Sequence, residues 1–434
     1  MKKIIRIVDL FSFAIFAPVL AAAISVVLAL PLRSRRRRRG QDINRFSFAI
    51  ADMISNKYPA MTEDALLDGY IRRDYYIYLD FNNKKDRFEK IGDKIFFYSI
   101  SAHPDSAVCR AGFKRVSSLM VELKILYMAF FIIWKNKITF IKAHDPHLLG
   151  LNGLIMARLF MLPCALHMNS NFAMKYIGTG KVSSPVFVFR SIERLFESAV
   201  MKSYDIIMAD RKFYFESGAV PAASLPRYRV FGVRVDKAHY AEAICKNSAK
   251  EKLGLSDKKV LVYAGRLHPV KYPEDAIKAF GIVRGKISDA ILVIAGDGIL
   301  KERLVRLAKE MHLENDVLFL GQRMNKELAG LLRAADVMLA PHGGVTLLEA
   351  ALASIPVVAY DFDWHPEFLE DGKMGFLVNF RDEKGMAEAC LRLLSDEPLR
   401  RNFGEYARGV AMSRYGRNSS LERERCIYDE LLRG

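Results

Sequence analysis

The sequence predicts an α/β protein in which two Rossmann-like domains follow an N-terminal membrane helix. Short apolar runs alternate with amphipathic stretches, which is the pattern of a parallel sheet flanked by helices. The alternation begins near Arg45 and begins again near Lys258, and 434 residues are enough for two to three domains. One long uncharged run precedes Arg45, and it predicts the membrane segment.

The composition excludes several classes of protein. With 51% hydrophobic and 26% charged residues, the chain fits a globular protein and not a disordered or collagen-like one. The five cysteines are scattered and form no Cys-x-x-Cys pair, so we expect buried free thiols in a reducing compartment, without disulfides or a zinc site. The formal net charge is +17, and much of the basic excess lies in residues 1–45.

Residues 1–40 predict a membrane anchor. No residue from 10 to 32 is charged, and six of the seven residues 33–39 are arginine. Such a run can cross the hydrocarbon layer, whereas the apolar core of a cleaved signal peptide is shorter. The arginines favour anionic lipid headgroups, which predicts that the domains after them lie at the cytoplasmic, inner face of the cell membrane. Nucleic acid is not expected as a partner, because no aromatic residue interrupts the arginines. Pro18 and the basic residues at both ends leave a spanning and a re-entrant anchor open.

Residues 41–235 predict the first Rossmann-like domain. Its expected strands are 45–51, 75–81, 94–98, 138–143, 164–168, 205–209 and 228–231. The apolar run 125–134 is too short to span a membrane, and it fits either a buried helix or a helix resting in the membrane interface.

Residues 258–434 predict the second domain, after a polar linker at 236–257, and the last helix is expected to pack back on the first domain. The expected strands are 260–264, 290–295, 317–320, 337–340 and 356–359. Two such domains facing each other across a cleft bind ligands at the carboxyl ends of their strands.

Two motifs in the second domain carry chemistry. After strand 260–264, Gly265 allows close backbone approach, and Arg266 and Lys271 place two cations on one loop. This spacing suits a diphosphate, although two solvated surface cations would look the same. After strand 337–340, Gly343 and Gly344 form a tight loop before a helix, whose first amides and dipole favour an anion.

Together these motifs resemble the retaining GT-B glycosyltransferases of family 4, also called glycosyl transferases group 1. The resemblance rests on "YAGRLHPVKYPEDAIKAF", "LVIAGDGILKERL", "VLFLGQRMNKELAGLLRAADVMLAP" and "HGGVTLLEAALASIPVVAYDFDWHPEFLEDGKMGFLV", in this order. The first domain matches more loosely, through "IKAHDPHLLGLNGLIMARLFMLPCALHMNSN" and "SYDIIMAD".

The resemblance implies a donor site and the role of each residue in it. Arg266 and Lys271 would hold the donor diphosphate and stabilise its charge as it leaves, and Glu349 would bond the ribose. The other donor-side positions are Gly265, the backbone of Gly343, Gly344, Val345, Thr346 and Leu347 near the distal phosphate and sugar, and Gly321 and Gln322 at the base. His167 would lie beside the transferred sugar. The implied donor is a UDP- or GDP-sugar, with no cofactor and no metal.

The sequence departs from the family at three places. Pro341 stands where the first of two family glutamates is usual, and His342 beside it is a candidate substitute. Tyr272 stands where glycine is common, and the polar stretch 52–57 replaces a glycine-rich loop.

Two further clusters have open interpretations. Asp361 and Asp363 form an Asp-x-Asp triplet, which we interpret as coincidental and not as a metal site; the alternative is a role facing the sugar. His144 and Asp145 are candidate acceptor-side residues together with Asn56, although Asp145 fits a capping role equally well.

The function that the sequence predicts is that of a membrane-associated retaining glycosyltransferase. It would move a sugar from a nucleotide-sugar donor to a lipid-linked or glycan acceptor, in surface polysaccharide or glycolipid synthesis. The alternatives are a non-catalytic, membrane-tethered nucleotide-sugar binding or assembly protein and a GT-B nucleotide-sugar epimerase.

Overall fold

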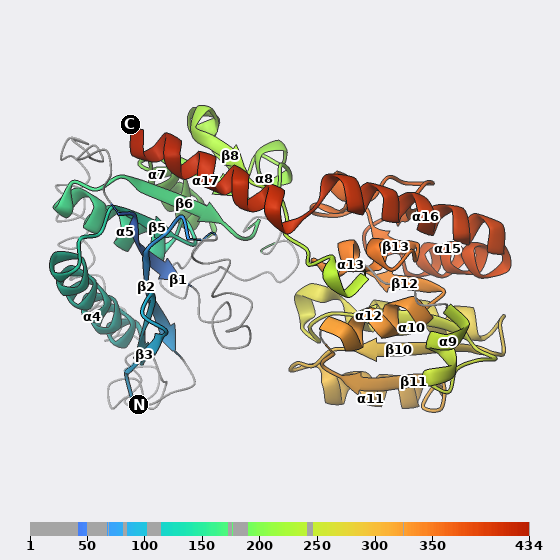
Figure 1. Cartoon of the computed structure of the whole chain (residues 1–434). Coiled ribbons are helices and arrows are strands. Elements are labelled where there is room, and N and C mark those ends of the chain that lie inside the picture. The colour runs from blue at the N-terminus through green and yellow to red at the C-terminus, as the bar shows by residue number, and fades with distance from the viewer. Residues whose placement is uncertain are drawn as a thin grey trace, which may run out of the picture. The chain divides into compact units, whose positions relative to one another are not determined.

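The computed structural model describes residues 42–49, 67, 69–80, 85–101, 114–171, 176, 190–240, 246–323 and 325–433 (Figure 1). They form two compact units. The first contains the described residues up to Phe231 together with those from Leu421 onward, and the second contains Gly232–Ser420. Ser420 Oγ donates a hydrogen bond to the Gly232 carbonyl at 2.8 Å, which joins the two places where the chain passes from one unit to the other.

The first unit contains an eight-stranded sheet in the order β3-β4-β2-β1-β5-β6-β7-β8. The strands are β1 Asn44–Ala49, β2 Arg73–Asp80, β3 Arg87–Ile91, β4 Ile95–Ser101, β5 Phe140–Ala143, β6 Cys164–Met168, β7 Ile206–Ala209 and β8 Tyr228–Val230. All neighbours are parallel except β3 and β4. The sequence missed β3, because this edge strand is charged and mostly exposed and so carries no apolar alternation.

Helices cover both faces of this sheet. They are α4 Lys114–Lys135, α5 Leu148–Phe160, α7 Arg190–Lys202, α8 Phe213–Glu216, the 3-10 turn η2 Ala222–Arg227 and α17 Arg417–Arg433. Side chains of α4, α5 and α7 share one apolar cluster with the sheet, and side chains of α17 share a second cluster with β5, β6 and β7. The last helix therefore packs on the first sheet.

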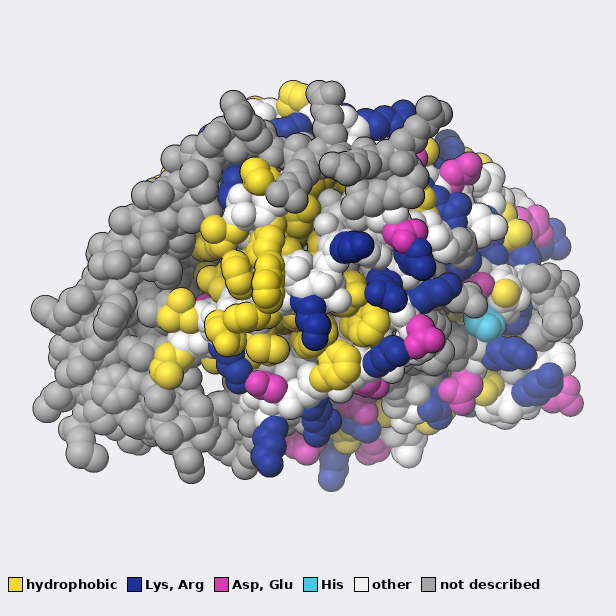
Figure 2. All heavy atoms as spheres, turned by 60° about the vertical axis from the view of Figure 1, so that its left-hand side comes forward, with side chains coloured by type: hydrophobic (Ala, Val, Ile, Leu, Met, Phe, Trp, Pro, Cys, Tyr) yellow, Lys and Arg dark blue, Asp and Glu magenta, His cyan; other side chains and the backbone are white. Residues whose placement is uncertain are grey.

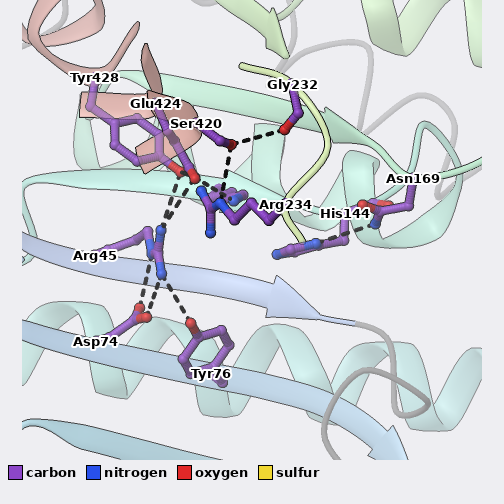
Figure 3. Close-up of polar contacts among 11 residues, drawn as sticks. Arg45, Asp74, Tyr76, His144, Asn169, Gly232, Arg234, Ser420, Glu424 and Tyr428 are labelled. Carbon is purple, nitrogen blue, oxygen red and sulfur yellow. Dashed lines mark hydrogen bonds and ion pairs between the residues drawn. The ribbon is translucent and has the colours of Figure 1, made fainter. Parts of the chain in front are cut away.

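Buried charges also hold α17 to the first sheet (Figure 3). Arg45 on β1 donates to both carboxylate oxygens of Asp74 on β2, at 3.1 and 2.6 Å, and to the hydroxyl of Tyr428 on α17 at 3.1 Å. Lys142 on β5 pairs with Glu424 on α17 at 3.2 Å. All five side chains are buried, so each charge depends on its partner for the solvation that water would otherwise give it.

The second unit contains a six-stranded parallel sheet in the order β11-β10-β9-β12-β13-β14. The strands are β9 Lys259–Ala264, β10 Ala290–Ala295, β11 Val317–Gly321, β12 Val337–Ala340, β13 Val357–Tyr360 and β14 Gly375–Val378. Strands β10, β12 and β13 are buried throughout, which explains their continuous apolar runs. The sequence missed β14, a four-residue edge strand.

The helical elements of the second unit lie between and after its strands. They are η3 Ala238–Tyr240, α9 Lys246–Lys252, η4 Pro269–Lys271, α10 Pro273–Arg284, α11 Lys301–Glu310, α12 Asn325–Ala334, α13 Thr346–Leu352, α14 His365–Phe368, α15 Glu383–Ser395 and α16 Glu397–Arg414. The stretch expected as a linker, 236–257, contains η3 and α9, and Lys250 on α9 pairs with Asp336 at 2.8 Å.

The predicted membrane anchor is not tested by the described residues, whereas the expectation of buried thiols is tested for three cysteines. No helix among the described residues is long and apolar enough to cross a membrane, and the predicted anchor at 1–40 lies outside them. Of the cysteines that can be described, Cys164 and Cys390 are buried, whereas Cys426 on α17 is exposed, so the expectation of buried thiols was wrong for Cys426.

Candidate functional site

The first motif lies where β9 and β10 end side by side. The Gly265 amide donates to Ala295 O at 3.0 Å, and the Leu267 amide donates to Asp297 O at 2.9 Å. A Cβ atom on Gly296 would lie 1.9 Å from Gly265 O, and one on Gly298 would lie 2.5 Å from Leu267 O. The glycines of "AGDG" are therefore required because two backbones touch there, a reason that the sequence analysis did not recognise.

Arg266, which is exposed, and Lys271, which is half-buried, lie on the loop that this contact supports. Arg266 follows the end of β9, and its carbonyl accepts from the Tyr263 hydroxyl at 3.2 Å. Lys271 ends the short turn η4, and its amide donates to His268 O at 2.9 Å. The loop that carries both cations is thus fixed by backbone contacts, which keeps their positions defined before a ligand arrives.

His342 joins the second motif to the first. The loop after β12 lies beside the loop after β9, since these strands are neighbours in the sheet. His342 Nδ1 lies 2.6 Å from Val270 O, the carbonyl next to Lys271. The two stretches that the sequence singled out separately are therefore in contact at one edge of the second sheet.

The other ring nitrogen of His342 contacts Asp363, the last residue of the Asp-x-Asp triplet. His342 Nε2 lies 3.0 Å from Asp363 Oδ2. The imidazole of His342 thus lies between a backbone carbonyl oxygen and a carboxylate oxygen. His365 is adjacent, with its ring 5.6 Å from that of His342, and burial followed by the charge of His342 lowers the pKa of His365 to about 3. Asp363 therefore has a partner within the protein.

The glycine loop itself is tight. A Cβ atom on Gly343 would lie 2.5 Å from the Leu347 side chain, so this position also requires glycine. The Leu347 amide already donates to Gly344 O at 3.1 Å. Of the backbone amides expected to meet the donor, that of Leu347 is thus used within the turn. The hydrogen bonds among the described residues include none from the amides of Gly344 and Val345, which can donate to a ligand.

Glu349 lies on α13 beside a residue that the sequence did not predict. Tyr240 is buried, and burial followed by the nearby Glu349 carboxylate raises the pKa of its hydroxyl well above its usual value. The Arg333 guanidinium lies over the Tyr240 ring, 5.6 Å from the centroid. Tyr240 comes from η3, about 110 residues before Glu349, and no motif in the sequence marks it.

The predicted base-binding positions lie at the end of β11. Gly321 O accepts from the Gly296 amide at 2.9 Å, so this end is fixed against the loop that supports Gly265. Gly321 has φ +71°, and Gln322 after it is exposed.

Tyr272 shows why glycine is common at its position. Its φ is +49°, in the left-handed region that disfavours side chains. The ring lies against Phe380, with centroids 5.4 Å apart, and under the Arg381 guanidinium at 5.1 Å. These ring contacts of Tyr272 offset the conformational free energy that its left-handed backbone costs.

In the first unit, the strand ends bring two histidines together. His144 follows β5 and His167 lies on β6, and their ring centroids are 5.1 Å apart. Asn169 Nδ2 donates to His144 O at 2.9 Å. Burial, followed by the charges of Lys142 and Arg45, holds the pKa of His144 well below its usual value, so the ring is neutral at physiological pH.

Asp145 has a local role. Its Oδ1 accepts from the His147 amide at 2.8 Å and so caps the turn before α5, which favours the capping interpretation. The third candidate acceptor-side residue, Asn56, lies outside the described residues.

One set of metal-ligating side chains occurs among the described residues, namely His147, Glu193 and Glu197. His147 Nε2 lies 2.8 Å from Glu197 Oε1, and Arg190 pairs with Glu193 at 2.7 Å and with Glu197 at 2.6 Å. Burial works to raise the pKa of Glu197, but hydrogen bonds from His147 and Arg190 bring it below its usual value. The Arg190 guanidinium thus pairs with both carboxylates, and the hydrogen bond between His147 and Glu197 ties the loop that carries His144 to α7.

The comparisons with known proteins identify a family region in the second unit and a similar overall fold. Residues 246–410, within the second unit, match the family Glycosyl transferases group 1. The N-acetyl-alpha-D-glucosaminyl L-malate synthase of Bacillus anthracis is 32% identical over 189 residues, which cover 42% of this chain and 49% of that protein. The chain therefore spans about half the length of this relative.

A longer match connects the chain to an enzyme with a lipid-linked acceptor. The UDP-Gal:alpha-D-GlcNAc-diphosphoundecaprenol alpha-1,3-galactosyltransferase of Escherichia coli is 27% identical over 292 residues, covering 65% of this chain and 73% of that enzyme. The sucrose-phosphate synthase of Thermosynechococcus elongatus has a similar fold, with a TM-score of 0.74 at 18% identity, covering 90% of this chain and 99% of the other. The chain thus has a GT-B-like fold of two parallel α/β units, and the second unit carries a glycosyl transferases group 1 region.

Proposed function

We propose that the protein is a membrane-associated retaining glycosyltransferase. It transfers a sugar from a nucleotide-sugar donor to a lipid-linked or glycan acceptor at the cytoplasmic face of the membrane. The observation that carries the proposal is the contact between His342 and Val270 O, because it unites the Arg266–Lys271 loop and the Gly343–Glu349 loop in one site. The glycosyltransferase names of the relatives support the same reaction class.

In this proposal the donor diphosphate lies against Arg266 and Lys271. The bond between the anomeric carbon and the diphosphate breaks, and its electron pair leaves with the diphosphate. The two cations stabilise that charge as it develops. The acceptor oxygen bonds to the same face of the sugar, and its proton passes to the departing diphosphate. No metal ion is required for these steps, and Glu349 holds the ribose.

The acceptor follows from two features. The uncharged run 10–32 and its arginines favour a substrate at the membrane surface. The Escherichia coli relative acts on a diphosphoundecaprenol-linked sugar. A lipid-linked acceptor also explains an anchor, which a nucleotide-sugar epimerase with soluble substrates does not need.

The test begins with the donor. UDP-, GDP- and ADP-sugars are added to the purified full chain, and the one that raises the melting temperature is used for transfer to membrane lipid extract. Arg266→Ala and Lys271→Ala should each reduce transfer by about 100-fold or more. Arg401→Ala, which removes an exposed cation on α16, is the matched control and should leave transfer unchanged. Full activity in both site variants refutes the assignment, and NMR of the product anomer tests retention.

A further inference from the structure

One face of α4 is apolar and exposed to solvent. The side chains of Ile125, Ala129, Ile132 and Ile133 enter the core of the first unit. The opposite face carries a stripe at helical spacing, made of Met120, Leu123, Tyr127, Phe130, Phe131 and Trp134. Trp134 is 70% exposed and Tyr127 is 62% exposed. The sequence suggested either a buried helix or a helix in the membrane interface. Neither interpretation by itself describes α4, because one face of the helix is buried and the other is exposed.

The aromatic side chains of this face form a continuous surface. Phe131 contacts Tyr127, Phe130 and Trp134, with ring centroids 4.8, 5.6 and 6.4 Å apart. Phe130 also contacts Phe160 at the end of α5, at 5.2 Å. The left side of Figure 1, where α4 lies, is brought forward in Figure 2, and apolar side chains gather there with basic ones beside them.

Charge distinguishes a lipid surface from a protein partner. Lys135 and Lys137 are exposed at the end of α4 and just after it, whereas Lys124, also exposed, pairs with Asp86 at 2.6 Å. The acid in the stretch 120–135, Glu122, accepts from Asn152 at 2.7 Å, and burial raises its pKa to about 7. Aromatic side chains fringed by lysines, with the carboxylate withdrawn, match the interface of an anionic bilayer.

Chain connectivity places this face close to the predicted anchor. Asn44, the first residue of β1, donates from Nδ2 to Lys137 O at 3.0 Å and from its amide to Thr139 Oγ1 at 3.0 Å. Arg39 ends the arginine run only five residues earlier. A fully extended chain of that length reaches at most about 18 Å. The end of α4 that carries Trp134 is therefore held near the arginines.

We propose that the exposed face of α4 docks onto the anionic surface of the bilayer, with its aromatic side chains at the boundary of headgroups and acyl chains. This rests on the membrane association proposed above and adds a second contact, made by the first unit itself. Docking orients this unit toward an acceptor whose sugar lies at the membrane surface, while the lipid tail stays in the bilayer.

Trp134 supplies the readout. The chain has two tryptophans, and the other, Trp364 in the second unit, is buried at 2% exposure. The full chain is reconstituted into phosphatidylcholine vesicles with and without about 30% phosphatidylglycerol, with acyl chains plain or brominated. Docking shifts Trp134 emission to the blue in the anionic vesicles, and bromine there reduces it by about twofold. The variant Trp134→Phe measures the background from Trp364.

A triple variant tests the consequence for activity. Tyr127→Ser/Phe131→Ser/Trp134→Ser should lower transfer to a lipid-linked acceptor by about tenfold, while the melting shift caused by the donor stays unchanged. The control, Ile299→Ser/Val305→Ser, removes exposed apolar side chains from the second unit. It should change neither transfer to the lipid-linked acceptor nor the melting shift caused by the donor.

Three results overturn the proposal. First, the protein binds the vesicles but brominated lipid does not quench Trp134. This result excludes docking of α4, because the anchor alone then accounts for binding. Second, emission that is already blue-shifted before vesicles are added, and changes with protein concentration, assigns the face to a second copy of the chain. Third, Trp134 emission is blue-shifted at every protein concentration and vesicles do not change it. This result means that another segment of the chain covers the exposed face of α4. Donor binding and transfer to a soluble acceptor are measured separately, so the proposed glycosyltransferase activity can stand when docking fails.

Discussion

Both units contain buried ion pairs, but these pairs join segments at very different separations along the sequence. The sheet of the second unit is closed by apolar strands and by glycines where backbones touch, as at Gly296 and Gly265. The first sheet instead receives its last helix through buried charges, in which Arg45 and Lys142 meet Asp74 and Glu424. Apolar runs and glycines are visible in a sequence, whereas the ion pairs of the first unit join residues up to 379 positions apart. Lys250 and Asp336 in the second unit are 86 positions apart. The sequence therefore predicts most strands of both sheets but not the ion pairs that attach α17 to the first sheet.

The largest effect is expected from breaking the ion network. Arg45→Ala leaves Asp74 buried without its cation, which should lower the free energy of unfolding by about 3–5 kcal/mol. The control is Arg72→Ala, since Arg72 and Asp42 form an exposed ion pair just before β2 and β1, and it should cost less than about 1 kcal/mol. Urea denaturation measures both. Equal losses in the two variants would show that burial of the network does not matter.

The next effect lies in the second unit. Gly296→Ala forces a Cβ atom against Gly265 O, which should cost about 2–3 kcal/mol and displace the loop that carries Arg266. Donor affinity, measured by calorimetry, should fall as well. Gly330→Ala on α12 meets open space and should stabilise the unit by about 0.5–1 kcal/mol. Unchanged stability of Gly296→Ala would contradict the close contact.

A smaller effect depends on pH. The pKa of Glu122 is raised by burial from 4.5 to about 7, so the folded state holds a proton that the unfolded state loses between these values. Stability should therefore fall by about 1–3 kcal/mol as the pH rises from 4.5 through 7. Glu122→Gln keeps an acceptor for Asn152 and removes this dependence, so the variant gains stability above pH 7. Melting curves from pH 4 to 8 measure it, and Glu405→Gln, on the exposed surface, should follow the native curve.

The smallest effect concerns the site. Asp363→Asn removes the charge that faces His342 Nε2 and should weaken donor binding by about fivefold, near 1 kcal/mol. Asp361→Asn, two residues earlier in the same triplet, is the control. Calorimetry measures the affinity of each variant for the donor. Melting temperatures, measured in parallel, separate weaker donor binding from a folding defect. If both variants bind the donor like the native chain, the contact between His342 and Asp363 has no part in positioning the loop.

The sequence by itself determined the two alternations of strand and helix, most strand positions in both sheets, and the loops that carry Arg266, Lys271 and Glu349. These follow from local signals, namely apolar runs, glycines and turn residues. Only the tertiary structure decided that His342 touches Val270 O and Asp363, that Tyr240 lies beside Glu349, and that His144 meets His167. The tertiary structure also decided which face of α4 is buried. In an apolar run both faces of the helix carry apolar residues, so the sequence alone does not distinguish them. Contacts between distant segments depend on strand order and register, and no local pattern encodes these.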